Sequence, residues 1–117
     1  MSNWSYNAGS LVLWVLIAIV AFCWFKFPKK GDELIVAASH NDTNGIVRLL
    51  SSGVSVDYAT KSEKKTALMM ASAKGGTEAV EFLLRMGADK NVKDIVARTA
   101  FDYALANGHT NLLELLK

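Results

Sequence analysis

The fold of this chain is decided by residues 66–91, TALMMASAKGGTEAVEFLLRMGADKN. Thr66 stands directly before a run of apolar residues at helical spacing, where its hydroxyl can cap the first turn. Gly75 and Gly76 interrupt this pattern, and a second apolar pattern then runs to Gly87, a residue suited to the left-handed end of a helix. We therefore predict two short helices joined by a tight turn.

The same pattern recurs on both sides of this stretch. Residues 34–38 align with residues 68–72 at an offset of about 34, and residues 99–104 align with residues 66–71 at an offset of about 33. Asp32 and Thr99 stand where Thr66 stands, and Gly53 stands where Gly87 stands. The period predicts three stacked helix pairs, with Asp32, Thr66 and Thr99 as helix caps.

These units resemble ankyrin repeats over residues 32–117, in units of about 32–60, 61–94 and 95–117. The resemblance implies a solenoid of about three helix-loop-helix units that binds proteins through its loop tips and the concave face of its first helices. The chain departs from the family pattern at five positions: alanine replaces a proline at Ala67 and Ala100, other residues replace a histidine at Met69 and Asp102, and Ala97 replaces a turn glycine.

We predict the protein-binding residues from this resemblance and from the loop sequences. The outward position of the first helices carries an apolar stripe, and the second loop carries aliphatic residues where polar ones are usual, which suggests contact with a protein or with lipid. The alternatives are a stripe that packs only on neighbouring loops, and a basic first loop that is only a solvated turn. The predicted residues are Val36, Met70 and Tyr103 in the stripe, Ile95, Val96 and Arg98 in the second loop, and Lys64 and Lys65 in the first loop.

Ahead of the repeats, residues 11–25 read LVLWVLIAIVAFCWF and contain no charge, proline or glycine. A helix that is apolar all round is typical of a membrane span or a deeply buried core helix. We predict an all-α protein with a tail over residues 1–10, a transmembrane helix over residues 11–27 and a linker over residues 28–31. A core helix or a cleaved signal peptide are the alternatives, and the lack of a basic residue in the tail disfavours the peptide.

The flanking charges predict the orientation of this helix. Basic residues follow the apolar run and none precedes it, which places the repeats in the cytoplasm and the N-terminus outside. We expect a single-pass protein of a bacterial inner membrane, with a eukaryotic organelle facing the cytosol as the alternative. The predicted membrane-interface residues are Trp4, Tyr6, Trp24, Lys26, Lys29 and Lys30.

The sequence contains no pattern typical of a catalytic or metal site. It has one cysteine and two histidines, without metal-ligand spacing. A net charge of +2 does not favour a nucleic-acid partner. We predict no enzyme activity, no cofactor and no small-molecule substrate.

Two functions remain open from the sequence. The first is a membrane-anchored module that docks a protein partner on the cytoplasmic membrane face through its repeats. The second is a structural accessory subunit of a larger membrane complex, held mainly by its transmembrane helix. The predicted partners are accordingly a protein, an integral membrane complex among the candidates, and the lipid bilayer.

Overall fold

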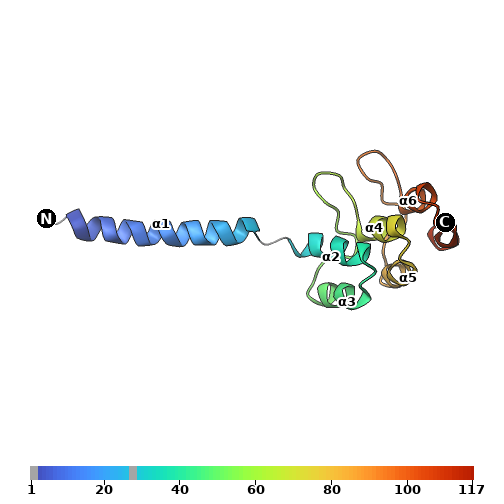
Figure 1. Ribbon diagram of the computed structural model, residues 1–117, viewed down its shortest axis with the longest axis horizontal. Coiled ribbons are helices and arrows are strands. Elements are labelled where there is room, and N and C mark those ends of the chain that lie inside the picture. Colours follow the sequence, from blue (N-terminus) through green and yellow to red (C-terminus); the bar gives the residue numbers. More distant parts are fainter. Residues whose placement is uncertain (1–2, 27–28) are drawn as a thin grey trace.

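The computed structural model describes residues 3–26 and 29–117, and within the first range it describes the side chains of residues 10–22. Its first helix, α1 (Asn3–Lys26), lies outside the stack of short helices that the rest of the chain forms (Figure 1). The apolar side chains of residues 11–17 in this helix are exposed in the chain on its own.

The prediction of a transmembrane helix needs correction. Across the ranges that the structure describes, no helix combines the length and the apolar character that crossing a bilayer requires. This finding overturns the predicted span over residues 11–27 and the single-pass membrane localisation that rested on it.

The rest of the chain forms helix pairs at the predicted period. The first pair is α2 (Lys30–Ser39) and α3 (Thr43–Ser51), and the second is α4 (Ala67–Lys74) and α5 (Thr77–Arg85). The third unit consists of α6 (Ala100–Ala106), the short 3-10 helix η1 (Thr110–Leu112) and α7 (Leu113–Leu116). An all-helical repeat fold is thereby confirmed for this part of the chain.

Side-chain caps fix where three of these helices begin, namely α3, α4 and α6. Thr66 accepts a hydrogen bond from Met69 N at 3.3 Å, and Asp42 accepts one from Gly45 N at 3.0 Å. Thr99 and Asp102 form a capping box, in which each side chain accepts a hydrogen bond from the other's backbone N–H. Each such cap satisfies a backbone donor that the first helical turn leaves without a partner.

Asp32 is not the helix cap that the sequence predicted. Helix α2 begins at Lys30, inside the predicted linker, so Asp32 lies in its first turn. There its carboxylate accepts a hydrogen bond from Tyr58 Oη at 3.0 Å, a partner that is remote in sequence. Gly53 and Gly87 do have the predicted left-handed backbone, with φ of 97° and 92°.

The core lies between two layers of helices. The inner layer is α2, α4 and α6, each in extensive contact with the next, and the outer layer is α3, α5 and α7 with η1 (Figure 1). Alanines at the contacts between inner helices are fully or almost fully buried, namely Ala38, Ala67, Ala71, Ala100 and Ala104. Their small side chains let the helix backbones approach closely, while Leu34, Ile46, Leu68 and Leu83 fill the space between the layers.

A polar contact also joins the first two units. Helix α5 has Gly76 at its N-cap and therefore no side-chain cap of its own. Asn41, in the turn between α2 and α3, supplies one instead: its Oδ1 accepts a hydrogen bond from Ala79 N at 2.9 Å, and its Nδ2 donates one to Glu78 at 2.8 Å. The first unit therefore caps a helix of the second.

We expect Asn41→Gly to lower the free energy of unfolding by about 1–2 kcal/mol, because it removes this cap while tolerating the backbone φ of 54° at this position. Urea denaturation followed by circular dichroism measures the change. Lys64→Gly is the matched control, since Lys64 has the same φ of 54° but an exposed side chain. Equal destabilisation by the two substitutions would contradict a capping role for Asn41.

Candidate functional site

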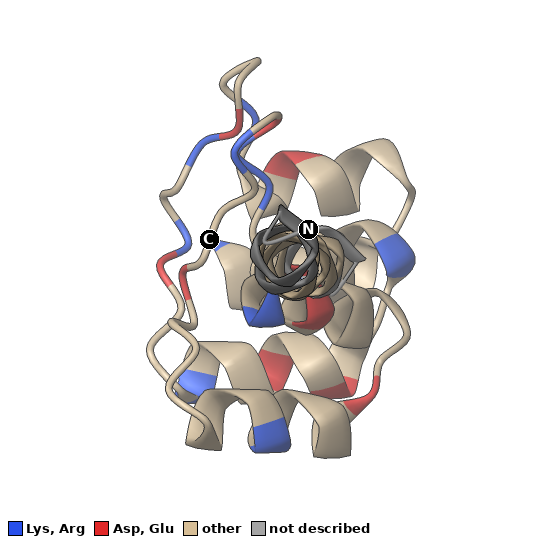
Figure 2. Ribbon diagram, turned by 90° about the vertical axis from the view of Figure 1, so that its left-hand side faces the viewer, with Lys and Arg blue, Asp and Glu red and all other residues tan. Residues whose placement is uncertain are grey.

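Two loops project from the same edge of the stack, one between α3 and α4 and the other between α5 and α6 (Figure 1). Figure 2 shows both from the end of the stack, with acidic and basic residues along each. We call residues 60–65 the first tip and residues 94–98 the second tip. The first tip is closed by Thr60, whose N–H donates to Lys65 O at 3.0 Å and whose Oγ1 accepts from Lys65 N at 3.1 Å.

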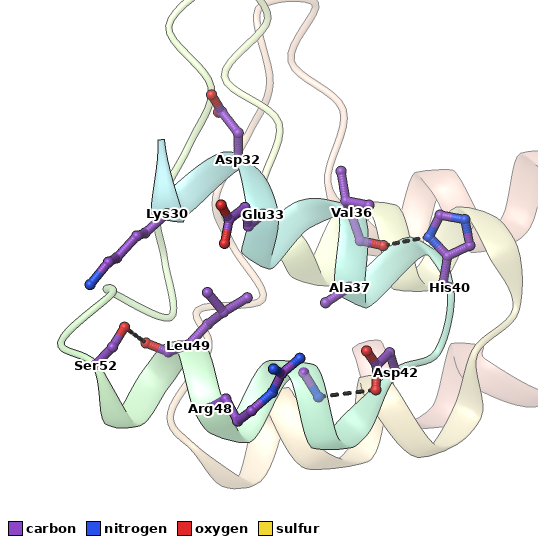
Figure 3. A pocket seen from close by; sticks show the side chains of 11 residues that line it. Lys30, Asp32, Glu33, Val36, Ala37, His40, Asp42, Arg48, Leu49 and Ser52 are labelled. Carbon is purple, nitrogen blue, oxygen red and sulfur yellow. Dashed lines mark hydrogen bonds between the residues drawn. The ribbon is translucent and has the colours of Figure 1, made fainter. Parts of the chain in front are cut away.

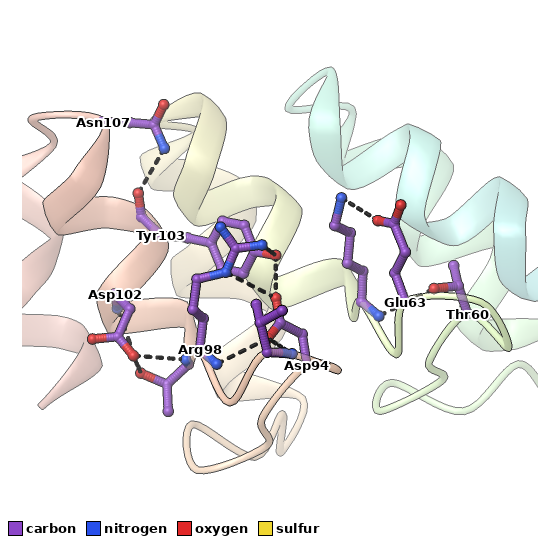
Figure 4. Close-up of polar contacts among 10 residues, drawn as sticks. Thr60, Glu63, Asp94, Arg98, Asp102, Tyr103 and Asn107 are labelled. Atoms are coloured by element: carbon purple, nitrogen blue, oxygen red, sulfur yellow. Dashed lines mark hydrogen bonds and ion pairs between the residues drawn. The ribbon is translucent and has the colours of Figure 1, made fainter.

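The second tip is organised around the carboxylate of Asp94, which is only 6% exposed. Its Oδ1 accepts hydrogen bonds from Val96 N at 3.0 Å and from Arg98 N at 2.9 Å (Figure 4). The backbone N–H of Asp94 donates to Arg98 O at 3.0 Å, which closes the tip. One side chain thus binds the backbone at two points of the turn and fixes its shape.

Tyr103 and Arg98 hold this carboxylate from the other side. The Tyr103 hydroxyl donates to Asp94 Oδ2 at 2.5 Å, and Arg98 Nε donates to the same oxygen at 3.1 Å (Figure 4). The guanidinium of Arg98 also lies over the Tyr103 ring, 4.7 Å from its centroid, within the range of a cation–π contact. Because Tyr103 belongs to α6, these contacts anchor the tip to the helical core.

The pKa values of both acids reflect these contacts. Desolvation on burial acts to raise the pKa of Asp94, but hydrogen bonds from the Tyr103 hydroxyl, the N–H groups of Arg98 and Val96 and the guanidinium outweigh it and lower the pKa to about 2. Burial, followed by the hydrogen bond to Asp94 and its charge, raises the pKa of Tyr103 to about 12. Asp94 is therefore ionised and Tyr103 protonated at neutral pH.

The two tips are also joined to each other. Ile95 N donates to Glu63 O in the first tip at 3.0 Å, and the Glu63 side chain forms an ion pair with Lys65. Each tip has one non-glycine residue in the left-handed region, Lys64 with φ of 54° and Ala97 with φ of 65°. The left-handed turn that a glycine would usually supply is thus present at Ala97.

This framework displays two aliphatic side chains. Ile95 is 65% exposed and Val96 is 60% exposed, although the backbone N–H of each is hydrogen-bonded within the loops. Exposed aliphatic side chains on a fixed backbone can be buried by a partner at little conformational cost.

The other predicted binding residues lie in different surroundings. Val36 is 55% exposed and Met70 is partly buried, whereas Tyr103 is only 8% exposed. The expected stripe across the inner helices is therefore interrupted at Tyr103, whose ring is covered because its hydroxyl reaches Asp94. In the first tip, Lys64 is exposed and Lys65 is half-buried beside Glu63.

The predicted membrane-interface residues are mostly outside the part that can be described. Lys29 and Lys30 are exposed at the start of α2. The side chains of Trp4, Tyr6, Trp24 and Lys26 lie outside the described residues.

Sequence reasoning missed the organising role of Asp94 and the capping role of Asn41. The available signal for Asp94 was an arginine four residues later, a spacing at which the two side chains of a tight turn can meet. Among the described side chains there is no group of three or more histidine, cysteine or acidic residues arranged to hold a metal ion.

Comparison with known proteins identifies the repeats. A sequence model described as ankyrin repeats in three copies matches residues 34–117. Mitochondrial disaggregase of Bos taurus is 35% identical over 108 residues, which are 88% of this chain and 16% of that protein. The ankyrin repeat and KH domain-containing protein mask-1 of Caenorhabditis elegans is 34% identical over 109 residues, 92% of this chain and 4% of that protein.

A plant protein matches in the same way. The probable E3 ubiquitin-protein ligase XBOS33 of Oryza sativa is 33% identical over 87 residues, which are 74% of this chain and 17% of that protein. The chain thus spans less than a fifth of the length of each of these relatives.

We expect the stabilising effect of the Asp94 carboxylate to disappear in acid. The pKa of Asp94 in the folded protein, about 2, is below its ordinary value of 3.8. The carboxylate therefore stabilises the fold fully at pH values above 3.8, and this stabilisation is lost as the pH falls towards 2. Asp94→Asn should therefore be less stable than the wild type at neutral pH, and the difference should shrink between about pH 5 and pH 2. Urea denaturation at a series of pH values measures this, and a difference independent of pH would contradict it.

Proposed function

Because this chain belongs to the ankyrin-repeat family, we propose that it is a protein-interaction module that binds a protein partner through the second tip. The family fold is typically a non-catalytic interaction fold, and matches to repeats in much longer proteins are consistent with a module of this kind. The activities that the relatives' names describe belong to those proteins and are no part of this proposal.

The observation that carries the proposal is the exposure of Ile95 and Val96 on a tip whose backbone is already fixed. Burial of one such side chain contributes about 1.5–3 kcal/mol. A flexible loop would lose part of this to ordering, but the hydrogen bonds of Asp94 and Glu63 already order this one. Two adjacent aliphatic side chains on a rigid turn therefore make an effective anchor for an apolar pocket on a partner.

The remaining predicted residues have secondary parts in this proposal. Arg98 and Tyr103 are positioning residues, because they hold Asp94 and thereby the tip. Lys64 offers a positive charge at the neighbouring tip, and Val36 and Met70 extend the contact surface along the inner helices. An accessory subunit held by a membrane-spanning helix is not carried further, since its premise has been overturned.

We expect Ile95→Ser and Val96→Ser each to weaken partner binding by at least about tenfold, which corresponds to about 1.4 kcal/mol. A photo-crosslinking amino acid at position 95 of the full-length chain first identifies the partner, with position 85 on the outer layer as the comparison site. The Kd of the purified partner is then measured by isothermal titration calorimetry for the wild type and both variants.

Val47→Ser is the matched control, because Val47 is a 43% exposed valine of α3 that lies away from both tips. It should leave the Kd unchanged. The proposal fails if the crosslinked protein binds the two tip variants as tightly as it binds the wild type.

A further inference from the structure

The first end of the stack carries a groove between α2 and α3, on the side away from α4 (Figure 3). It has a volume of about 560 Å³, and its apolar floor is formed by Val36, Ala37 and Leu49. This groove lies apart from the second tip, and of its lining residues only Val36 also belongs to the surface proposed for the tip partner.

The repeat relates this groove to faces that are covered elsewhere in the stack. Ala37 and Leu49 correspond to Ala71 and Leu83 in the second unit, about 34 positions later. Both of these are fully buried, in helices α4 and α5 that α2 and α3 contact. The groove is therefore the uncovered counterpart of a surface that packs against a helix pair inside the stack.

Charged side chains of both signs line the groove: Asp32 and Asp42 accept hydrogen bonds from Tyr58 and from Gly45 N, and Lys30 lies at the start of α2. Glu33 projects from α2 and Arg48 projects from α3 (Figure 3). In the second unit the corresponding positions hold Ala67 and Phe82, so the charges are particular to this open end. Both residues are exposed, and within the described part of the chain neither side chain has a hydrogen bond or an ion pair.

We propose that this groove binds an amphipathic helix of a partner protein. The apolar stripe of that helix lies against Val36, Ala37 and Leu49, a basic residue on one flank meets Glu33, and an acidic residue on the other flank meets Arg48. The occupant is helical because the equivalent face of the next unit is covered by helices. Its flanks are of opposite charge because a helix without them would bury Glu33 and Arg48 unpaired, which is costly.

The test uses the full-length chain and a displayed library of amphipathic helical peptides, with Kd values measured by fluorescence anisotropy. The selected peptides should carry Lys or Arg on one flank of their apolar stripe and Asp or Glu on the other. Val36→Glu should weaken their binding at least about tenfold. Val47→Glu, a change of the same kind on α3 but outside the groove, should leave it unchanged.

A charge exchange separates loss of the site from loss of the fold. The double variant Glu33→Arg with Arg48→Glu should lose the selected peptide and bind its charge-exchanged counterpart with about the original affinity. The proposal is overturned if the two peptides bind this variant equally, or if Val36→Glu has no effect. It is also overturned if sedimentation shows a wild-type dimer that Val36→Glu dissociates, because a second copy would then fill the groove.

Discussion

The close approach of the inner helices is the constraint on which the structure depends. Alanines such as Ala71 and Ala104 allow α2, α4 and α6 to lie side by side, and no single helix pair could bury its apolar face without its neighbours. This packing places successive loops next to each other along one edge. The hydrogen bond from Ile95 to the backbone of Glu63 is possible only because two loops that are remote in sequence are brought together in this way.

The second tip shows how a repeat scaffold can make a loop rigid. Asp94 combines backbone contacts in the turn with side-chain contacts to Arg98 and Tyr103, so the turn is fastened to helix α6. The polar side chains of the loop are used for this internal support. Its aliphatic side chains, Ile95 and Val96, are then the ones left facing outward, which reverses the usual arrangement of a surface turn.

Much of the repeat architecture could be predicted from sequence because its signals are local. Thr66 and Thr99 cap helices through contacts within three residues, and Gly87 ends a helix through its own backbone. The same reasoning failed where contacts between residues remote in sequence decide the position of a side chain. Asp32 was predicted as a cap but is bound by Tyr58, and Tyr103 was predicted as exposed but is turned inward by Asp94. The apolar run of residues 11–25 predicted a membrane span from composition alone. Among the described residues, however, no helix has both the length and the apolar character that a span requires.

The cap that Asn41 supplies to α5 makes the second unit depend on the first. The third unit carries its own capping box at Thr99 and Asp102, so the first turn of α6 is capped by residues of its own unit. Helix α5 lacks such a signal, and its first turn is completed only when the preceding turn is already in place. Part of the coupling between neighbouring units is thus built into a helix end rather than into the apolar interface. A chain cut after α3 would leave α5 without its cap, whatever apolar surface the second half retained.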